Sequence, residues 1–150
     1  GWPRSARHGA ALGQAFLSAC APQIEPTDTS AVVRLYSGGA FNGYSESELF
    51  PDDVMRVTTS GPFGEDKKVR NVKLAAGAFT TARDCIFAHP IPARALHSTA
   101  ICDDYGADIV SYSGPDRAVD YRALCPNERL GKLYRELGSV IDSHRIPAGK

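Results

Sequence analysis

The sequence predicts an α+β fold in which an antiparallel sheet, a meander of several short strands, carries one central and one C-terminal helix packed on one face. Three observations lead to this fold class. Four short β-forming runs follow one another between Ala31 and Leu74, each bounded by turn residues. The hydrophobic period changes to that of a helix after Gly77 and returns to strand-like runs after Pro92. The C-terminal segment has a strong amphipathic helical pattern.

The first four strands are predicted by runs rich in β-branched and aromatic residues. These runs read AVVRLY, AFNGYSESELF, VMRVTTS and VRNVKL, at residues 31–36, 40–50, 54–60 and 69–74. They are separated by SGG, by the turn PDD and by the loop GPFGEDKK. Gly38 and Gly39 are expected to form the first hairpin turn, because glycine adopts a positive φ at little steric cost. Consecutive short strands of this kind favour an antiparallel meander.

A central helix is expected from Gly77 to about His89, where prolines at positions 90 and 92 stop it. Its apolar residues share one face: Phe79, Ala82, Ile86 and Phe87. A second β block is then predicted by ALHSTAIC, ADIVSYS and AVDYR, at residues 95–102, 107–113 and 118–122. The turns DDYG and GPDR separate these three runs.

The C-terminal helix is predicted to start after Asn127, whose side chain can cap it. Its apolar stripe consists of Leu130, Leu133, Tyr134, Leu137, Val140 and Ile141. The opposite face carries the charged residues Glu128, Lys132, Arg135 and Glu136, which we expect to face solvent. A helix with this pattern buries one side against the sheet.

Composition limits the classes of function. With 150 residues and a hydrophobic content of 43%, the chain is long enough for one domain with a real core. Its 17 basic and 17 acidic residues give a net charge of zero, so we expect no nucleic-acid partner. No apolar run approaches the roughly 18 to 20 residues that span a bilayer. Membrane contact is therefore expected only through an anchor.

The first twenty residues have the features of an export signal. Arg4 and Arg7 precede the moderately apolar stretch GAALGQAFLSA, and no acidic residue occurs in this segment. The sequence LSAC at Leu17–Cys20 resembles the lipobox of bacterial lipoproteins, which has an apolar residue, two small residues and an invariant cysteine. The resemblance covers residues 4–30. It implies that Cys20 is lipidated and that the protein is lipid-anchored in the bacterial periplasm or cell envelope.

The segment after Cys20 reads APQIEPTDTS, and we expect it to form a linker over residues 21–30. A single α+β domain would then occupy residues 31–147. The alternative for residues 1–20 is an N-terminal helix that is capped by Ser5 and ended by Pro22. In that case the chain would be a subunit of a larger assembly and would use residues 1–20 as a docking helix.

The other three cysteines, Cys85, Cys102 and Cys125, are the candidates for a disulfide. If Cys20 is acylated, they form one pair and leave one free thiol, because an exported protein is oxidised. The Cys85–Cys102 pairing is favoured, since these two residues flank the Pro90–Pro92 turn symmetrically and would be neighbours if helix and strand pack antiparallel. The pairing Cys102–Cys125 is the alternative.

Two kinds of chemical site can be drawn around these cysteines. Cys85, His89, His97 and Cys102 have zinc-type donors, but their spacing is unlike that of common zinc modules. Cys85 or Cys102, with His89 or His97 as base and Asp103 or Asp104 as orienting group, could form a nucleophilic site. In each case no linear motif marks the arrangement.

The sequence contains no motif that indicates an enzyme class. The glycines of SGGAFNG lack the Lys-Ser/Thr and the following helix of a phosphate-binding loop. The sequence contains neither GxSxG nor HExxH. We therefore expect no cofactor, no metal and no catalytic residue, and a non-enzymatic binding or structural role with an envelope protein as partner. A small envelope hydrolase with a Cys/His site is the alternative from a different class.

Overall fold

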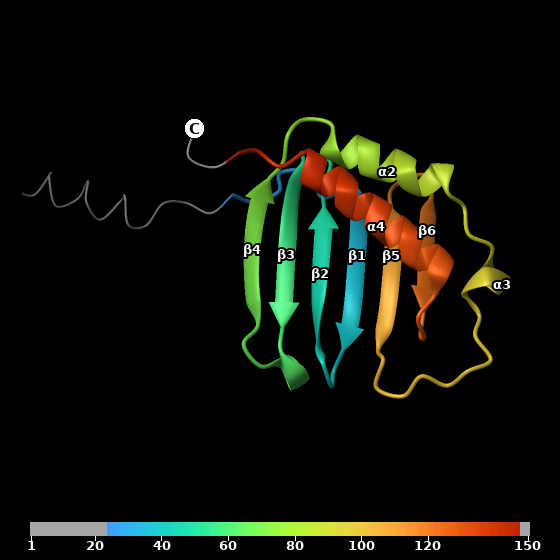
Figure 1. Cartoon of the computed structure of the whole chain (residues 1–150). Coiled ribbons are helices and arrows are strands. Elements are labelled where there is room, and N and C mark those ends of the chain that lie inside the picture. The colour runs from blue at the N-terminus through green and yellow to red at the C-terminus, as the bar shows by residue number, and fades with distance from the viewer. Residues whose placement is uncertain (1–23, 148–150) are drawn as a thin grey trace, which may run out of the picture.

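The structure, a computed structural model, describes residues 24–147. These residues form a six-stranded antiparallel sheet with the strand order β4-β3-β2-β1-β5-β6, and two helices pack against one of its faces (Figure 1). The predicted α+β class is confirmed, including the meander and the placement of the central and C-terminal helices on one face. Residues 1–20, with the predicted signal and Cys20, lie outside the described residues.

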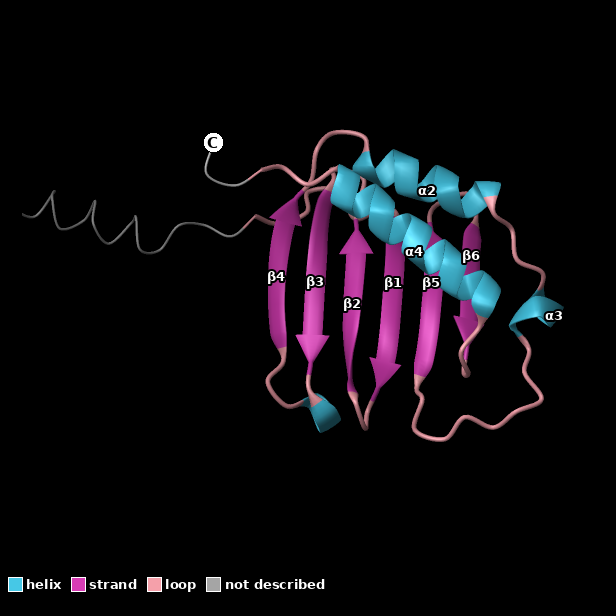
Figure 2. Ribbon diagram, viewed as in Figure 1, coloured by secondary structure: helices cyan, strands magenta, loops and turns pink. Residues whose placement is uncertain are grey.

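The elements alternate between short strands and connecting turns or helices (Figure 2). The strands are β1 (Val32–Gly39), β2 (Gly43–Leu49), β3 (Val54–Ser60), β4 (Lys68–Lys73), β5 (Ala107–Ser113) and β6 (Ala118–Ala123). The helical elements are the 3-10 turn η1 (Pro62–Gly64), α2 (Ala78–Ala88), α3 (Ala93–Leu96) and α4 (Glu128–Ser143). Strand β1 lies inside the sheet and pairs with both β2 and β5.

The first hairpin turn differs from the prediction. Gly38 and Gly39 are not in the turn; they are the last residues of β1 and pair with Tyr44 and Gly43. The turn itself comprises residues 40–42. Gly38 needs to be glycine for another reason: its φ is 126°, and an added Cβ would lie 2.2 Å from the Gly43 carbonyl oxygen.

The strand predicted over residues 95–102 is wrong. This segment contains the end of the short helix α3 and then a loop. Ala95 and Leu96 pack against the core, but residues 97–101 are all exposed. The segment therefore lacks the alternate buried positions that a strand on this sheet requires.

The core lies between the sheet and the two long helices. The buried residues of the helices are Ala78, Phe79, Ala82 and Ile86 on α2, and Leu130, Leu133, Leu137 and Ile141 on α4. They pack on inward-facing strand residues such as Val33, Leu49 and Val110, all at most 1% exposed. Helix α4 is capped as predicted, because the Asn127 Oδ1 accepts a hydrogen bond from the Leu130 N–H at 3.0 Å.

The start of α2 is held by a side chain from a distant turn. Asp53, in the β2–β3 turn, accepts hydrogen bonds from the backbone N–H groups of Gly77 at 3.1 Å and Phe79 at 2.8 Å. A carboxylate at this position satisfies free helix donors and interacts favourably with the helix dipole. The turn PDD thus positions the central helix on the sheet.

Residues 24–30, part of the predicted linker, contain no helix or strand and contact the domain through β3, β4 and the β2–β3 turn. The Asn71 side chain donates to the Ile24 carbonyl at 2.5 Å, and Asp52 accepts from the Thr27 N–H at 2.6 Å. Among the described residues there is no helix with the length and hydropathy required to cross a bilayer.

Candidate functional site

One end of the sheet is made of turns, and we call it the loop end. It comprises residues 40–42, 61–67, 101–106 and 124–125, where β1, β3 and β6 end and β2, β4 and β5 begin. Figure 1 shows it at the end of the sheet opposite to the start of β1. The loop end brings together segments that are far apart in the sequence.

Hydrogen bonds connect the loops of this end. The Phe63 N–H donates to the Ala40 carbonyl at 2.7 Å, which ties the β3–β4 loop to the β1–β2 turn. The Asn42 side chain donates to the Asp104 carbonyl at 3.1 Å, which ties the same turn to the loop before β5. The loop end is therefore one connected surface.

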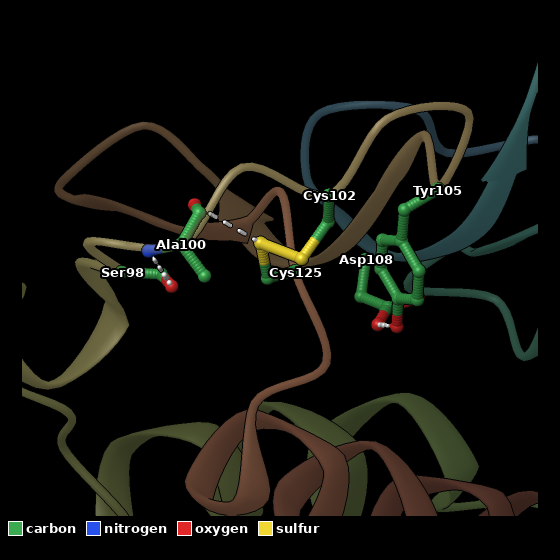
Figure 3. The surroundings of a disulfide bond; sticks show 6 residues. All are labelled: Ser98, Ala100, Cys102, Tyr105, Asp108 and Cys125. Atoms are coloured by element: carbon green, nitrogen blue, oxygen red, sulfur yellow. Dashed lines mark hydrogen bonds between the residues drawn. A yellow bond between two sulfur atoms is a disulfide. The ribbon is translucent and has the colours of Figure 1, made fainter.

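A disulfide between Cys102 and Cys125 holds the loop before β5 to the residues that follow β6 (Figure 3). Their Cα atoms are 5.4 Å apart. The favoured pairing Cys85–Cys102 is wrong, because the chain after α3 does not return beside α2 as a strand and Cys102 lies at the loop end instead. Cys85 has no disulfide partner among the described residues. An intrachain disulfide is consistent with an oxidising, secreted compartment.

Asp108, at the start of β5, fixes the loop that carries Cys102 (Figure 3). Its carboxylate accepts hydrogen bonds from the Tyr105 hydroxyl and, at 2.7 Å, from the Ser37 hydroxyl. The hydrogen bond to Asp108, with burial and the carboxylate charge, raises the pKa of Tyr105 to about 12. The Tyr105 phenol is thus held in its protonated, donating form.

Four large apolar side chains are exposed at the loop end: Phe41 (56%), Phe63 (69%), Ile101 (87%) and Leu124 (62%). Only three other large apolar residues in the described part of the chain are exposed, namely Ile24, Val69 and Ile146. Exposed apolar residues that gather on one surface mark an interaction site more strongly than scattered ones.

Phe41 and Phe63 form an aromatic pair on this surface. Their ring centroids are 5.4 Å apart and their planes meet at 80°, an edge-to-face arrangement. Phe63 has φ 54° and ψ 31°, the left-handed region that costs a residue with a Cβ about 1–2 kcal/mol. This pair was not predicted, because the sequence pattern assigns Phe41 to a strand over residues 40–50 and Phe63 to a loop. Strain kept at an exposed aromatic residue suggests a functional role.

The helix-free face of the sheet has a different character, because part of its charge is paired. Arg34 forms an ion pair with Glu46, and the Arg56 guanidinium lies 3.8 Å from the Glu48 carboxylate. Burial, and then the neighbouring Glu46 charge, raises the pKa of Glu48. Tyr36 and Tyr44 stack at 5.2 Å on this face.

The Cys/His arrangements drawn from the sequence do not form. Cys102 is in the disulfide, and His97 lies in a hollow with Leu124 and Cys125. Cys85 on α2 and His89 directly after it remain together, and Glu136 of α4 joins them. Glu136 was expected to face solvent only. Neither the zinc-type donor set Cys85, His89, His97 and Cys102 nor a Cys/His/Asp site that includes residues 97, 102 and 103 is present as one cluster.

Cys85 is also a poor nucleophile in this structure. Burial, and then the negative charge of Glu136, raises the pKa of its thiol. The thiolate is the reactive form of cysteine, so a raised pKa lowers its reactivity at neutral pH. The arrangement thus favours binding over covalent catalysis at this position.

Comparison of the sequence with the models of known protein families and with curated proteins gives no match.

Proposed function

We propose that the protein is an exported, lipid-anchored envelope protein with a non-enzymatic role, and that it binds a protein partner through the loop end. The observation that carries the proposal is the exposed Phe41–Phe63 pair, held on hydrogen-bonded loops by a backbone with a positive φ at Phe63. Pre-ordered aromatic side chains contribute to binding without a large entropy cost on association.

The compartment is supported by two independent features. The Cys102–Cys125 disulfide is typical of proteins that fold in an oxidising environment. The lipobox-like sequence LSAC ends at Cys20, a few residues before Ile24, where the chain is bonded to the folded domain. Lipidation of Cys20 would attach the folded domain to a membrane from its N-terminal side.

The placement and charge of the loop end favour a protein partner over a lipid surface. The first strand begins at the opposite end of the sheet, so a tether leaves the loop end free to face away from its anchor (Figure 1). The loop end carries Glu65, Asp66, Asp103 and Asp104 against one basic residue, Lys67, all exposed. Anionic lipids would repel this charge. The expected partner therefore has an apolar surface with basic residues around it.

Site-specific photo-crosslinking in the native host tests this proposal. A photoreactive phenylalanine derivative is placed at position 41, at position 63 or, as a matched control, at position 146, which carries an equally exposed Ile at the other end of the domain. We expect one and the same protein to be crosslinked from positions 41 and 63 and not from position 146.

The partner found in this way is then purified and its affinity measured. The double variant Phe41→Ser/Phe63→Asn should bind it at least about tenfold more weakly, because central aromatic residues dominate interface energies. The variant Ile146→Ser should bind it as the unchanged protein does. Adducts with lipid only, adducts of equal yield from position 146, or an affinity that the double variant leaves unchanged would reject the loop end as a binding surface.

A further inference from the structure

A cluster of three metal-ligating side chains lies between the end of α2 and the middle of α4, on the helix-covered side of the sheet. Cys85 lies on the last turn of α2, and His89, four residues later, is the residue that directly follows the helix. Glu136 reaches them from the middle of α4. One donor atom from each residue can be chosen so that all three lie within 4.8 Å of one another. The Cys85 Sγ is 4.0 Å from the Glu136 Oε2, and the His89 Nε2 is 3.3 Å from the same oxygen.

The imidazole of His89 is held by the backbone at the end of α2. Its Nδ1 lies 2.8 Å from the Cys85 backbone carbonyl oxygen, so this nitrogen carries the proton and donates it. The lone pair of a neutral ring is then on Nε2, which faces the Glu136 carboxylate oxygen. Two acceptor atoms that face each other share a cation, which is either a proton, giving an ion pair, or a metal ion. A histidine that donates its second N–H to a carbonyl is the usual outer-shell arrangement around a bound metal.

We propose that Cys85, His89 and Glu136 bind a divalent transition-metal ion, with Zn²⁺ as the ion that suits their donors best. Sulfur, nitrogen and carboxylate oxygen are the three donor types that zinc takes in proteins. The separation of 3.3 Å between the His89 and Glu136 donors matches the edge of about 3.3 Å expected for a tetrahedron with bonds of ~2.05 Å. Calcium and magnesium prefer sites made entirely of oxygen.

The charges and the access to the cluster also suit a metal ion. A thiolate and a carboxylate together neutralise a divalent cation. The thiol proton leaves to solvent when the sulfur binds, so the metal overcomes the preference of Cys85 for its neutral form. A pocket of about 480 Å³ adjoins the cluster and is lined by His89 and Glu136 together with Ile91, Arg129 and Lys132. A fourth ligand, water or a small anion, can enter from it.

The disulfide explains how such a site persists in an oxidising compartment. Cys102 and Cys125 bond to each other, which leaves Cys85 without a disulfide partner among the described residues. A metal-bound thiolate is shielded from oxidation while the ion is present. The site would also join the end of α2 to α4, and metal binding to the folded state alone would stabilise this packing.

Metal titration of the full chain tests the proposal. The background is Cys20→Ser, so that Cys85 is the only thiol beside the intact disulfide. Zn²⁺ affinity is measured by competition with a chromophoric chelator, and Co²⁺ is used as a spectroscopic probe of a sulfur ligand. We expect one equivalent of metal, a thiolate-to-cobalt charge-transfer band, and a rise in the thermal unfolding midpoint on addition of Zn²⁺.

The variants Cys85→Ser, His89→Ala and Glu136→Gln should each weaken Zn²⁺ binding by at least about tenfold. Cys85→Ser should also abolish the charge-transfer band. His97→Ala and Glu128→Gln are the matched controls, since they remove an exposed histidine and a glutamate of α4 outside the cluster. All variants should have the same unfolding midpoint as the background protein within about 1–2 °C when a chelator is present, which shows that the fold is intact. Equal Zn²⁺ affinity in the three cluster variants and the two controls would mean that the cluster is only a histidine–glutamate ion pair, and would overturn the proposal.

Discussion

The ring of Phe63 meets the ring of Phe41 edge to face at a centroid distance of 5.4 Å, although the two residues belong to different turns of the sheet. The backbone N–H of Phe63 donates to the carbonyl of Ala40, the residue before Phe41, at 2.7 Å. This hydrogen bond fixes Phe63 in a left-handed conformation that disfavours a bulky side chain. The pair is thus an exposed aromatic surface that is kept at a cost in stability.

The strain at Phe63 can be measured with two substitutions that both remove the ring. Asparagine tolerates a positive φ better than alanine. We expect the Phe63→Asn variant to be more stable than the Phe63→Ala variant by about 0.5–1 kcal/mol in urea unfolding. The same two substitutions at Phe41, which is not among the residues with positive φ, should not show this order. Equal stabilities of the two Phe63 variants would show that the conformation is not strained.

The Cys102–Cys125 disulfide should make a large contribution to stability. Its residues are 23 positions apart. Closing a loop of that length lowers the conformational entropy of the unfolded chain, which raises the free energy of unfolding by about 3 kcal/mol. We expect the double variant Cys102→Ser/Cys125→Ser to lose about 2–4 kcal/mol of unfolding free energy. Cys85→Ser serves as the control, with a loss below about 1 kcal/mol for a half-buried side chain. A double variant as stable as this control would contradict the account.

The hydrogen bond between Tyr105 and Asp108 predicts a pH dependence at alkaline pH. The pKa of Tyr105 is raised to about 12, above its ordinary value of about 10, chiefly by this hydrogen bond. A group whose pKa is raised on folding stabilises the folded state at pH values below its pKa in the unfolded chain. This stabilisation is lost as the pH rises to the pKa of the folded state. Tyr105→Phe should therefore be less stable than the unchanged protein by about 1 kcal/mol at neutral pH. The stability difference between the two proteins, followed by urea unfolding at several pH values, should disappear between pH 10 and pH 12. A difference that is constant over this range would exclude the proposed bond.

The reactivity of Cys85 tests the cluster between α2 and α4 without metal. Burial first, and then the Glu136 charge, raises the pKa of the thiol. In the presence of a chelator, and in the Cys20→Ser background, alkylation at pH 8 should be slower in the folded protein than in the unfolded chain. Glu136→Gln should accelerate it, because the charge that disfavours the thiolate is removed. Glu128→Gln should have no effect. Alkylation that Glu136→Gln leaves unchanged would show that Glu136 exerts no influence on Cys85.

The parts of the fold that could be predicted are those set by local chemistry. Strands β3 and β5 have the predicted bounds because β-forming runs end at clear turn residues, and α4 begins after Asn127 because this side chain caps it. The segment 95–102 could not be predicted in this way. Its apolar residues resemble those of a strand. In the structure Ala95 and Leu96 pack on the core whereas residues 97–101 are all exposed, so the segment forms the end of a helix and then a loop.

The candidate sites depend on tertiary contacts, and the sequence did not reveal them. The choice of Cys125 as partner of Cys102 depends on β5 and β6 being adjacent strands. Glu136 joins Cys85 and His89 because α4 packs beside α2 and the Glu136 side chain points toward α2. A helical wheel of α4 alone places Glu136 on the solvent-facing side. Phe63, which has a positive φ, is hydrogen-bonded to Ala40 in a different turn, a contact that local sequence does not encode.

The claim that the protein is exported and lipid-anchored is tested most directly by the intact mass of the protein made in its native host. The account predicts a chain that starts at Cys20 and carries the added mass of a diacylglycerol and an acyl group, with two hydrogens missing for the disulfide. An unmodified chain that retains residues 1–19 would contradict the account, because Cys20 would then be free of lipid and the loop end would have no anchor from which to extend.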